Sequence, residues 1–179
     1  MRLFRLLDDV HVPGRWHLGD IPTDAGTTSR FLSGLSFQGQ LRAELTRDGV
    51  ELDFCLTSFA VPVASTRVAA CVAAIARHDV QRLPVQIEGH PGFEVLNVVR
   101  VIACVDEKRS ELTKWTDRDH RPDLAGKYRM VTRLRVDPAA VPNDAHVFRI
   151  EGWETAIIVT EVVMLAMAGC IGAKFEEVT

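Results

Sequence analysis

The chain lacks the long apolar and basic runs that mark membrane proteins and nucleic-acid-binding proteins. Its most apolar stretch, 156–171, is interrupted by Glu161 and is shorter than the ~20 uncharged residues that a membrane-spanning helix needs. No block of five or more basic residues occurs, and 21 Lys and Arg against 24 Asp and Glu give a formal net charge of -3. This balance supplies no electrostatic footprint for nonspecific binding of DNA or RNA. We therefore expect neither a membrane nor a nucleic acid as a direct partner.

Closely spaced cysteines are also missing. The four cysteines, Cys55, Cys71, Cys104 and Cys170, are at least sixteen residues apart and form no C-x-x-C pair, so the spacing indicates no zinc or redox site. We expect all four to be buried, reduced thiols. Acidic residues at positions 8 and 9 come too soon for the apolar region of a signal peptide, which favours a soluble protein of the cytoplasm.

What the chain does have is the composition of an ordinary globular domain. It has 179 residues, of which 47% are hydrophobic and 25% charged, and a chain of this length can bury about 70% of its unfolded surface. Apolar and polar residues alternate in enough segments for eight to ten strands, with two or three helices in an order that is not regularly βαβ. The expected fold is a single α+β domain, 1–179, with mostly antiparallel sheet.

The strongest local signal of β-structure is a hairpin. Residues 41–45 and 50–54 alternate in polarity on either side of Asp48-Gly49, a dipeptide that suits a tight hairpin turn. The stretch 21–39 shows no sustained period and is expected to form a long surface loop. Further strands are expected at 3–7, 16–18, 80–88, 93–105, 111–115, 128–136, 147–150, 156–159 and 173–178.

Two helices are expected to begin at capping residues. Ser65 is the expected N-cap of a helix that runs to about Arg77. One apolar stripe is expected on this helix, formed by Val68, Cys71, Val72 and Ile75. A second helix is expected to begin near Thr160, because a threonine, an acid and a run of helix formers follow in that order.

One polar loop holds the densest group of chemically active side chains. They are Asp117, Asp119, His120 and Asp123. Carboxylates and an imidazole at this spacing could bind a divalent metal ion, but the interleaved Arg118 and Arg121 would repel a cation and pair with the acids. We therefore expect a solvated or partner-contacting loop and no metal site.

The sequence contains no recognised catalytic motif. It has no G-x-S-x-G and no H-E-x-x-H, and the stretch 34–39 lacks the Lys-Ser/Thr of a phosphate-binding loop. His17, with Asp20 three residues further on, is the best remaining pair for acid–base chemistry, although a histidine beside a tryptophan is more often part of the fold. We expect no catalytic residue and no cofactor.

Two other sets of residues could serve a protein interface or merely the fold. Arg129, Arg133 and Arg135 form a partly one-faced basic row that could meet an acidic partner surface, although a solvated strand face is the simpler interpretation. Trp115 and Trp153 could be interface anchors, and for both we favour the core.

An ordered set of short motifs covers nearly the whole chain. These are Trp16-His17-Leu18-Gly19, Leu52-Asp53-Phe54, Pro62-Val63 with Ser65, Asp79 to Val85, Leu96-Asn97-Val98, Cys104-Val105-Asp106-Glu107, Arg109-Ser110, Tyr128-Arg129, Leu134 with Val136-Asp137-Pro138, Phe148-Arg149, Trp153, Ile158-Val159, Glu161, Gly172 and Phe175. In this order the set resembles the myxobacterial-type immunity protein family of bacterial polymorphic toxin systems, formerly a domain of unknown function.

The resemblance implies a non-enzymatic, cytoplasmic protein that binds a cognate toxin, encoded nearby, and protects the producing cell and its kin. No catalytic residue comes with the family. The expected partner contacts are Trp115, Asp117, Asp119, His120 and Asp123, because exposed loops on a rigid sheet often carry recognition. The alternative is a small enzyme that uses His17 or the 117–123 loop. A third hypothesis is a homodimer that pairs through the strand edge around Pro84.

Overall fold

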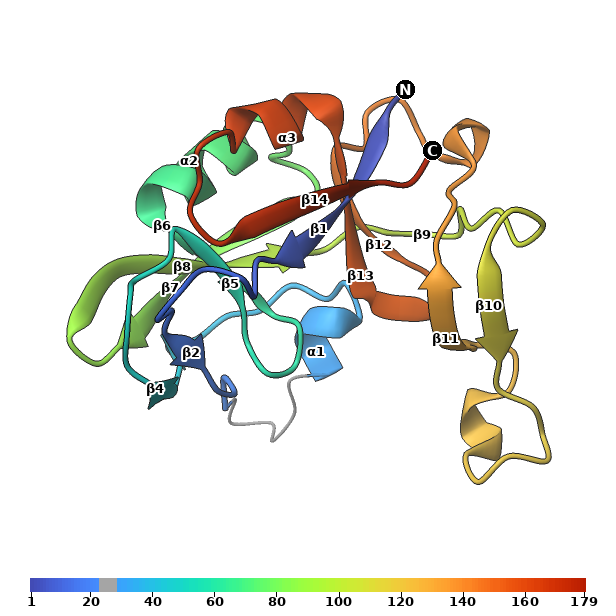
Figure 1. Ribbon diagram of the computed structural model, residues 1–179, viewed down its shortest axis with the longest axis horizontal. Coiled ribbons are helices and arrows are strands. Elements are labelled where there is room, and N and C mark those ends of the chain that lie inside the picture. The colour runs from blue at the N-terminus through green and yellow to red at the C-terminus, as the bar shows by residue number, and fades with distance from the viewer. Residues whose placement is uncertain (23–28) are drawn as a thin grey trace.

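The computed structural model describes residues 1–22 and 29–179, and its body is built from two five-stranded sheets (Figure 1). The first sheet has the order β14 (Ala173–Glu177), β1 (Leu3–Asp8), β13 (Trp153–Thr160), β12 (Val147–Ile150) and β9 (Val101–Ile102). The second has the order β3 (Leu41–Arg42), β7 (Val80–Ile87), β8 (His90–Val98), β6 (Pro62–Ser65) and β5 (Phe54–Leu56). Neighbouring strands are antiparallel except for β12 with β9 and β3 with β7. The expected α+β class with mostly antiparallel sheet is confirmed.

Two short ladders and the helices complete the structure. The ladders are β2 (His17–Leu18) with β4 (Leu45–Arg47), and β10 (Glu111–Lys114) with β11 (Tyr128–Arg133). The helices are α1 (Ser29–Leu32), α2 (Thr66–Ile75) and α3 (Glu161–Ala166), with 3-10 turns at Pro122–Leu124 and Pro138–Ala140. Figure 1 shows α2 and α3 side by side on one side of the body. Over the described ranges, no helix has the length and apolar character needed to cross a membrane.

A central core joins the two sheets. Its buried apolar residues come from β1, β12 and β13 of the first sheet, from β5 to β8 of the second, and from α2 and α3. A second cluster, around Trp16, covers the opposite face of the second sheet. A third, around Phe148, covers the opposite face of the first. Each sheet thus buries apolar side chains on both faces, which stabilises the strands against unfolding far more than their local propensities do.

The two predicted helix starts are confirmed, but the predicted apolar stripe is only partly right. Ser65 caps α2, because its hydroxyl accepts the backbone N–H of Val68 at 3.5 Å. Val68 and Val72 are buried together with Ala69, whereas Cys71 is exposed. The core-facing stripe of α2 therefore contains Ala69 in place of the predicted Cys71. The helix α3 begins directly after Thr160 as predicted, but the Thr160 side chain makes no capping hydrogen bond.

The cysteines do not all behave as expected. All four are free thiols, of which Cys55 and Cys104 are buried and Cys170 is half-buried, but Cys71 is exposed. Burial raises the pKa of Cys55, Cys104 and Cys170 to about 12, so these three thiols stay protonated at neutral pH.

The predicted hairpin 41–54 is wrong. The strand β3 pairs in parallel with β7, and β4 pairs with β2. The Asp48-Gly49 turn packs against a neighbouring turn, where the N–H of Val50 donates to the carbonyl of Gly14 at 2.7 Å and the N–H of Trp16 donates to the carbonyl of Val50 at 3.0 Å. The alternating polarity correctly marked half-buried segments, but it did not specify their partners.

Other predicted elements differ in their bounds. The strand expected at 93–105 stops at Val98, and Arg100 turns to pair with Asp79 and Asp144 before β9 begins. The expected loop 21–39 contains the short helix α1, and its residues 23–28 lie outside the described part of the chain. The strand expected at 128–136 ends at Arg133.

The strand edge proposed for self-association is already partly occupied. Leu41 and Arg42 of β3 pair with Val85 and Gln86 of β7. On a face of the sheet, the side-chain amide of Gln81 in β7 donates to the carbonyl of Phe37 at 2.7 Å and accepts the Phe37 N–H at 2.9 Å. Two copies could pair through this part of the β7 edge only after β3 was displaced from it. The homodimer therefore stays a prediction, and the occupied edge does not favour it.

Substituting Gly172 by alanine is expected to destabilise the fold by about 2–4 kcal/mol. The backbone strain of a non-glycine residue at positive φ and the steric overlap of the new Cβ both contribute to this loss. Gly172 has a φ of 98°, and an added Cβ would lie 2.1 Å from the carbonyl oxygen of Phe54. Gly169 offers a matched control, since its φ is 77° but no atom lies within 4 Å of an added Cβ. In urea denaturation, Gly172→Ala should lower the free energy of unfolding more than Gly169→Ala does. Equal losses in the two variants would show that the close approach to Phe54 does not matter.

Candidate functional site

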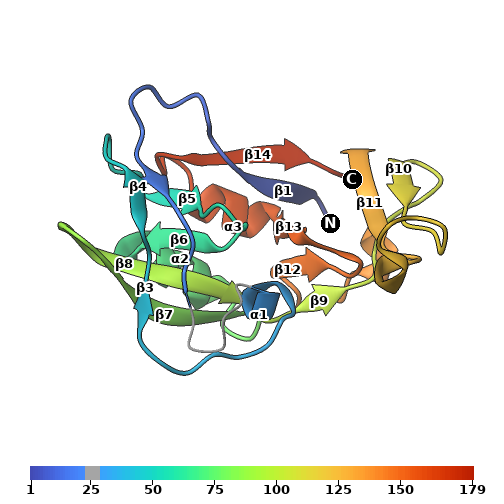
Figure 2. The same cartoon turned by 90° about the horizontal axis from the view of Figure 1, so that it is seen from below.

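The most prominent surface feature is an arm, which we define as residues 106–135. It comprises the β10–β11 ladder, the turn before it and the loop that connects the two strands. In both views the ladder stands at the end of the molecule away from the β3–β7–β8 sheet (Figure 1 and Figure 2). Backbone hydrogen bonds close the base of the loop, from Trp115 to the carbonyl of Lys127 and from Gly126 to the carbonyl of Trp115, both at 2.9 Å. The loop is therefore held on a rigid support.

Trp115 sits between two cationic or titratable side chains rather than in the core. It is half-buried, so the preference for the core was wrong for this residue. The Arg129 guanidinium lies 4.9 Å from its ring centroid, and the His120 ring makes an edge-on contact at 5.2 Å. Such cation–π and T-shaped contacts hold the indole in one orientation. Trp153 is also half-buried, but it packs against the third core cluster, and the Arg5 guanidinium lies 4.6 Å from its ring centroid.

Asp119 anchors the start of the loop. Its carboxylate accepts the backbone N–H of Thr116 at 2.8 Å and the Thr116 hydroxyl at 2.9 Å, and it pairs with Arg129 at 3.0 Å. These donors hold the pKa of Asp119 below its usual range, with the backbone N–H of Thr116 as the largest cause. The structure therefore brings Trp115, Asp119 and His120 into one cluster around Arg129.

The other two predicted contact residues lie apart from that cluster. Asp123 is held by Arg121 through two hydrogen bonds of 2.9 and 2.7 Å, which lower the pKa of its carboxyl. Asp117 is exposed on the turn that precedes Asp119. Across residues 1–22 and 29–179, no group of three or more His, Cys, Asp or Glu is placed to hold a metal ion.

The arm carries a second polar cluster that the sequence did not predict. Glu107 accepts the hydroxyl of Tyr128 at 2.8 Å and pairs with Lys114 at 2.6 Å. The Lys114 ammonium also lies 5.2 Å from the Tyr128 ring. Lys114 and Tyr128 are cross-strand partners in the β10–β11 ladder. The cluster links the turn at 106–110 to both strands, which stiffens the arm, and no sequence spacing indicates it because the ladder contains register shifts.

The single tyrosine of the chain offers a direct test of that cluster. Burial, together with the hydrogen bond to Glu107, raises the pKa of Tyr128 to about 12. The fold therefore favours the neutral phenol, and this contribution to stability is present below pH 10 and is lost as the pH rises from about 10 to about 12. We expect the tyrosinate absorbance to titrate with a midpoint near 12, and Glu107→Gln to move the midpoint down towards 10. A wild-type midpoint near 10 would mean that the cluster does not form.

Among the described residues, the hollow around His17 contains no assembled catalytic pair. It is lined by polar side chains that include Asp8, Arg15 and Ser58. Arg15 is committed to the fold, since its guanidinium pairs with Asp8 at 2.7 Å and donates to the carbonyl of Asp9 at 2.8 Å. His17 itself is exposed on β2. The hollow thus places His17 at a solvent-exposed rim rather than in an enclosed site.

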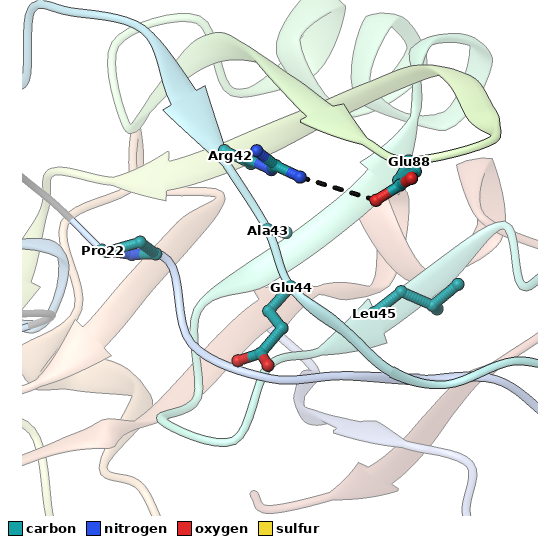
Figure 3. Close-up of a pocket in the computed structure, with 6 residues that line it drawn as sticks. All are labelled: Pro22, Arg42, Ala43, Glu44, Leu45 and Glu88. Atoms are coloured by element: carbon teal, nitrogen blue, oxygen red, sulfur yellow. Dashed lines mark ion pairs between the residues drawn. The ribbon is translucent and has the colours of Figure 1, made fainter.

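A second hollow lies beside β3 (Figure 3). Its polar residues are Arg42, Glu44 and Glu88, and Figure 3 shows Arg42 pointing towards Glu88 while Glu44 points away from that pair. The Arg42–Glu88 ion pair is 3.5 Å long and strongly exposed. Among the described residues that line this hollow there is no serine, cysteine or histidine.

Comparison with known families shows which family model the chain matches. The family model described as Immunity protein family (Imm11) matches residues 88–179, a little more than half of the chain, and this range contains the whole arm. The match confirms the resemblance that the sequence motifs predicted. No curated protein matches the chain.

Proposed function

Because the chain belongs to the immunity protein family (Imm11), we propose that it binds and neutralises a cognate bacterial toxin by stoichiometric protein–protein interaction. The family match over 88–179 is the observation that carries this proposal. The proposal includes a cytoplasmic site of action, a toxin encoded by a neighbouring gene of a polymorphic toxin system, and protection of the producing cell and its kin.

The arm is the proposed contact surface, with Trp115, Asp117, Asp119, His120 and Asp123 as the contact residues. Trp115 is half-buried and held by Arg129 and His120, so its large apolar ring loses little rotamer freedom when a partner covers it. Tryptophan and arginine are also the residue types that most often dominate binding energy at protein interfaces. A tryptophan held in one orientation at the base of the projecting loop therefore suits an interface anchor.

The lowered pKa values of three carboxyl groups on the arm support a role in binding rather than in acid–base catalysis. The carboxylates of Glu107, Asp119 and Asp123 are each held by a neighbouring cation, and the pKa of each is lowered by these and other hydrogen bonds. General acid–base catalysis needs instead a carboxyl or imidazole whose pKa lies near the working pH. Membership of an immunity family likewise supports a non-enzymatic role.

Coexpression with the product of the adjacent toxin gene tests the proposal. We expect the full chain to restore growth of cells that produce the toxin and to elute with it as one complex. A toxin from an unrelated system serves as the control, and it should be neither bound nor neutralised. Continued growth arrest, with the two proteins eluting separately, would refute the proposed function.

A further inference from the structure

The arm and the rest of the chain carry opposite net charge. Residues 106–135 contain nine Lys and Arg against six Asp and Glu, whereas the remaining 149 residues contain twelve against eighteen. The arm therefore has a formal net charge of +3, and the remainder has -6. The overall value of -3 hides this division, which follows the architecture because the arm is the part that projects from the two sheets.

Ion pairs within the arm neutralise most of its acids. Besides the pairs already described for Glu107, Asp119 and Asp123, Arg109 lies 3.9 Å from Asp106 and Arg133 lies 3.8 Å from Glu111. Five of the six acids are thus matched by five of the nine cations. Asp117 is the remaining acid.

Four cations of the arm are left without an ion-pair partner among the described residues. They are Lys108, Arg118, Lys127 and Arg135, of which Arg135 donates to the backbone carbonyl of Glu177 at 3.1 Å. Lys108, Arg118 and Lys127 are exposed. Arg118 lies in the same loop as Trp115, and Lys127 closes that loop. Two of the four unpaired cations, Arg118 and Lys127, therefore lie in or beside the loop that begins at the proposed anchor.

We infer that the arm docks on an acidic surface of the toxin, an inference that rests on the proposed function. An acidic surface is attracted by the arm and repelled by the negative body, so long-range electrostatics would orient the two proteins with the arm foremost. A basic toxin surface would instead be drawn to the body and away from the arm. The charge division thus specifies the chemistry of the partner surface as well as the side of this protein that meets it.

Two double variants with the same net charge test the inference. Arg118→Glu with Lys127→Glu reverses two free cations on the arm, and Arg47→Glu with Arg77→Glu reverses two exposed cations of the body. Both changes take the formal net charge from -3 to -7. The association rate constant with the purified toxin should be measured by stopped flow for the full-length proteins at low and high salt.

We expect the arm variant to associate about tenfold more slowly than wild type at low salt, with the difference shrinking at high salt, and the body variant to change much less. Equal slowing in the two variants, or faster association of the arm variant, would overturn the inference while leaving toxin binding intact. Absence of any complex with the wild-type chain would instead remove the proposed function, and this inference with it.

Discussion

Replacing Asp79 by alanine is expected to lower the free energy of unfolding by about 3–5 kcal/mol, which is the range for breaking a buried charged pair. Asp79 is 1% exposed and lies between α2 and β7. One carboxylate oxygen accepts the backbone N–H groups of His146 and Val147, at 2.7 and 3.1 Å, and the other pairs with Arg100 at 2.9 Å. Its loss would leave two buried N–H groups unpaired where the two sheets meet.

Asp144 provides the matched control, because it binds the same Arg100 guanidinium but is exposed. In urea denaturation, Asp144→Ala should lower the free energy of unfolding by only a small fraction of the loss that Asp79→Ala causes. Asp79→Asn should fall between the two, since the amide oxygen can still accept one or both N–H groups. A loss for Asp79→Ala no larger than that for Asp144→Ala would mean that Asp79 does not join the sheets.

Replacing Trp115 by alanine is expected to weaken toxin binding by about 2–4 kcal/mol, the range found for anchor residues at interface centres. This corresponds to roughly a 30- to 1,000-fold rise in Kd. The fold should be little affected, because Trp115 contacts only arm residues in the ring interactions described above. Calorimetric titration of the variant with purified toxin measures the change.

Leu165 on α3 is the control for loss of an exposed apolar side chain away from the arm. It is 61% exposed, and Leu165→Ala should leave the Kd within a few-fold of wild type. An unchanged Kd for Trp115→Ala, with a clear loss for Leu165→Ala, would place the interface on the helices. Such a result would contradict the arm as the contact surface while leaving the immunity function in place.

The sequence predicted those parts of the fold that depend on local chemistry. Ser65 caps α2 because a hydroxyl at that position satisfies a free N–H whatever the surroundings. The strand at 147–150 was predicted with its bounds from a short run of Val, Phe and Ile that only Arg149 interrupts. The hairpin 41–54 failed because strand pairing is decided by distant segments, here β7 and residues 14–16.

The candidate site was predictable in part for the same reason. The polar loop and Trp115 could be singled out from composition, and Trp115, Asp119 and His120 do come together. The residue that holds them together could not be predicted, because Arg129 reaches Asp119 and Trp115 across the β10–β11 ladder. The charge division between arm and body was hidden until the structure showed which residues project from the sheets.

Titration of toxin activity with this protein tests the central claim most directly. A neutraliser that acts by forming a one-to-one complex should reduce toxin activity in proportion to the amount added, with activity reaching zero at one equivalent. Loss of all toxin activity at a small fraction of one equivalent, progressing with time, would show that each molecule inactivates many toxin molecules. That result would contradict stoichiometric binding and identify the protein as an enzyme.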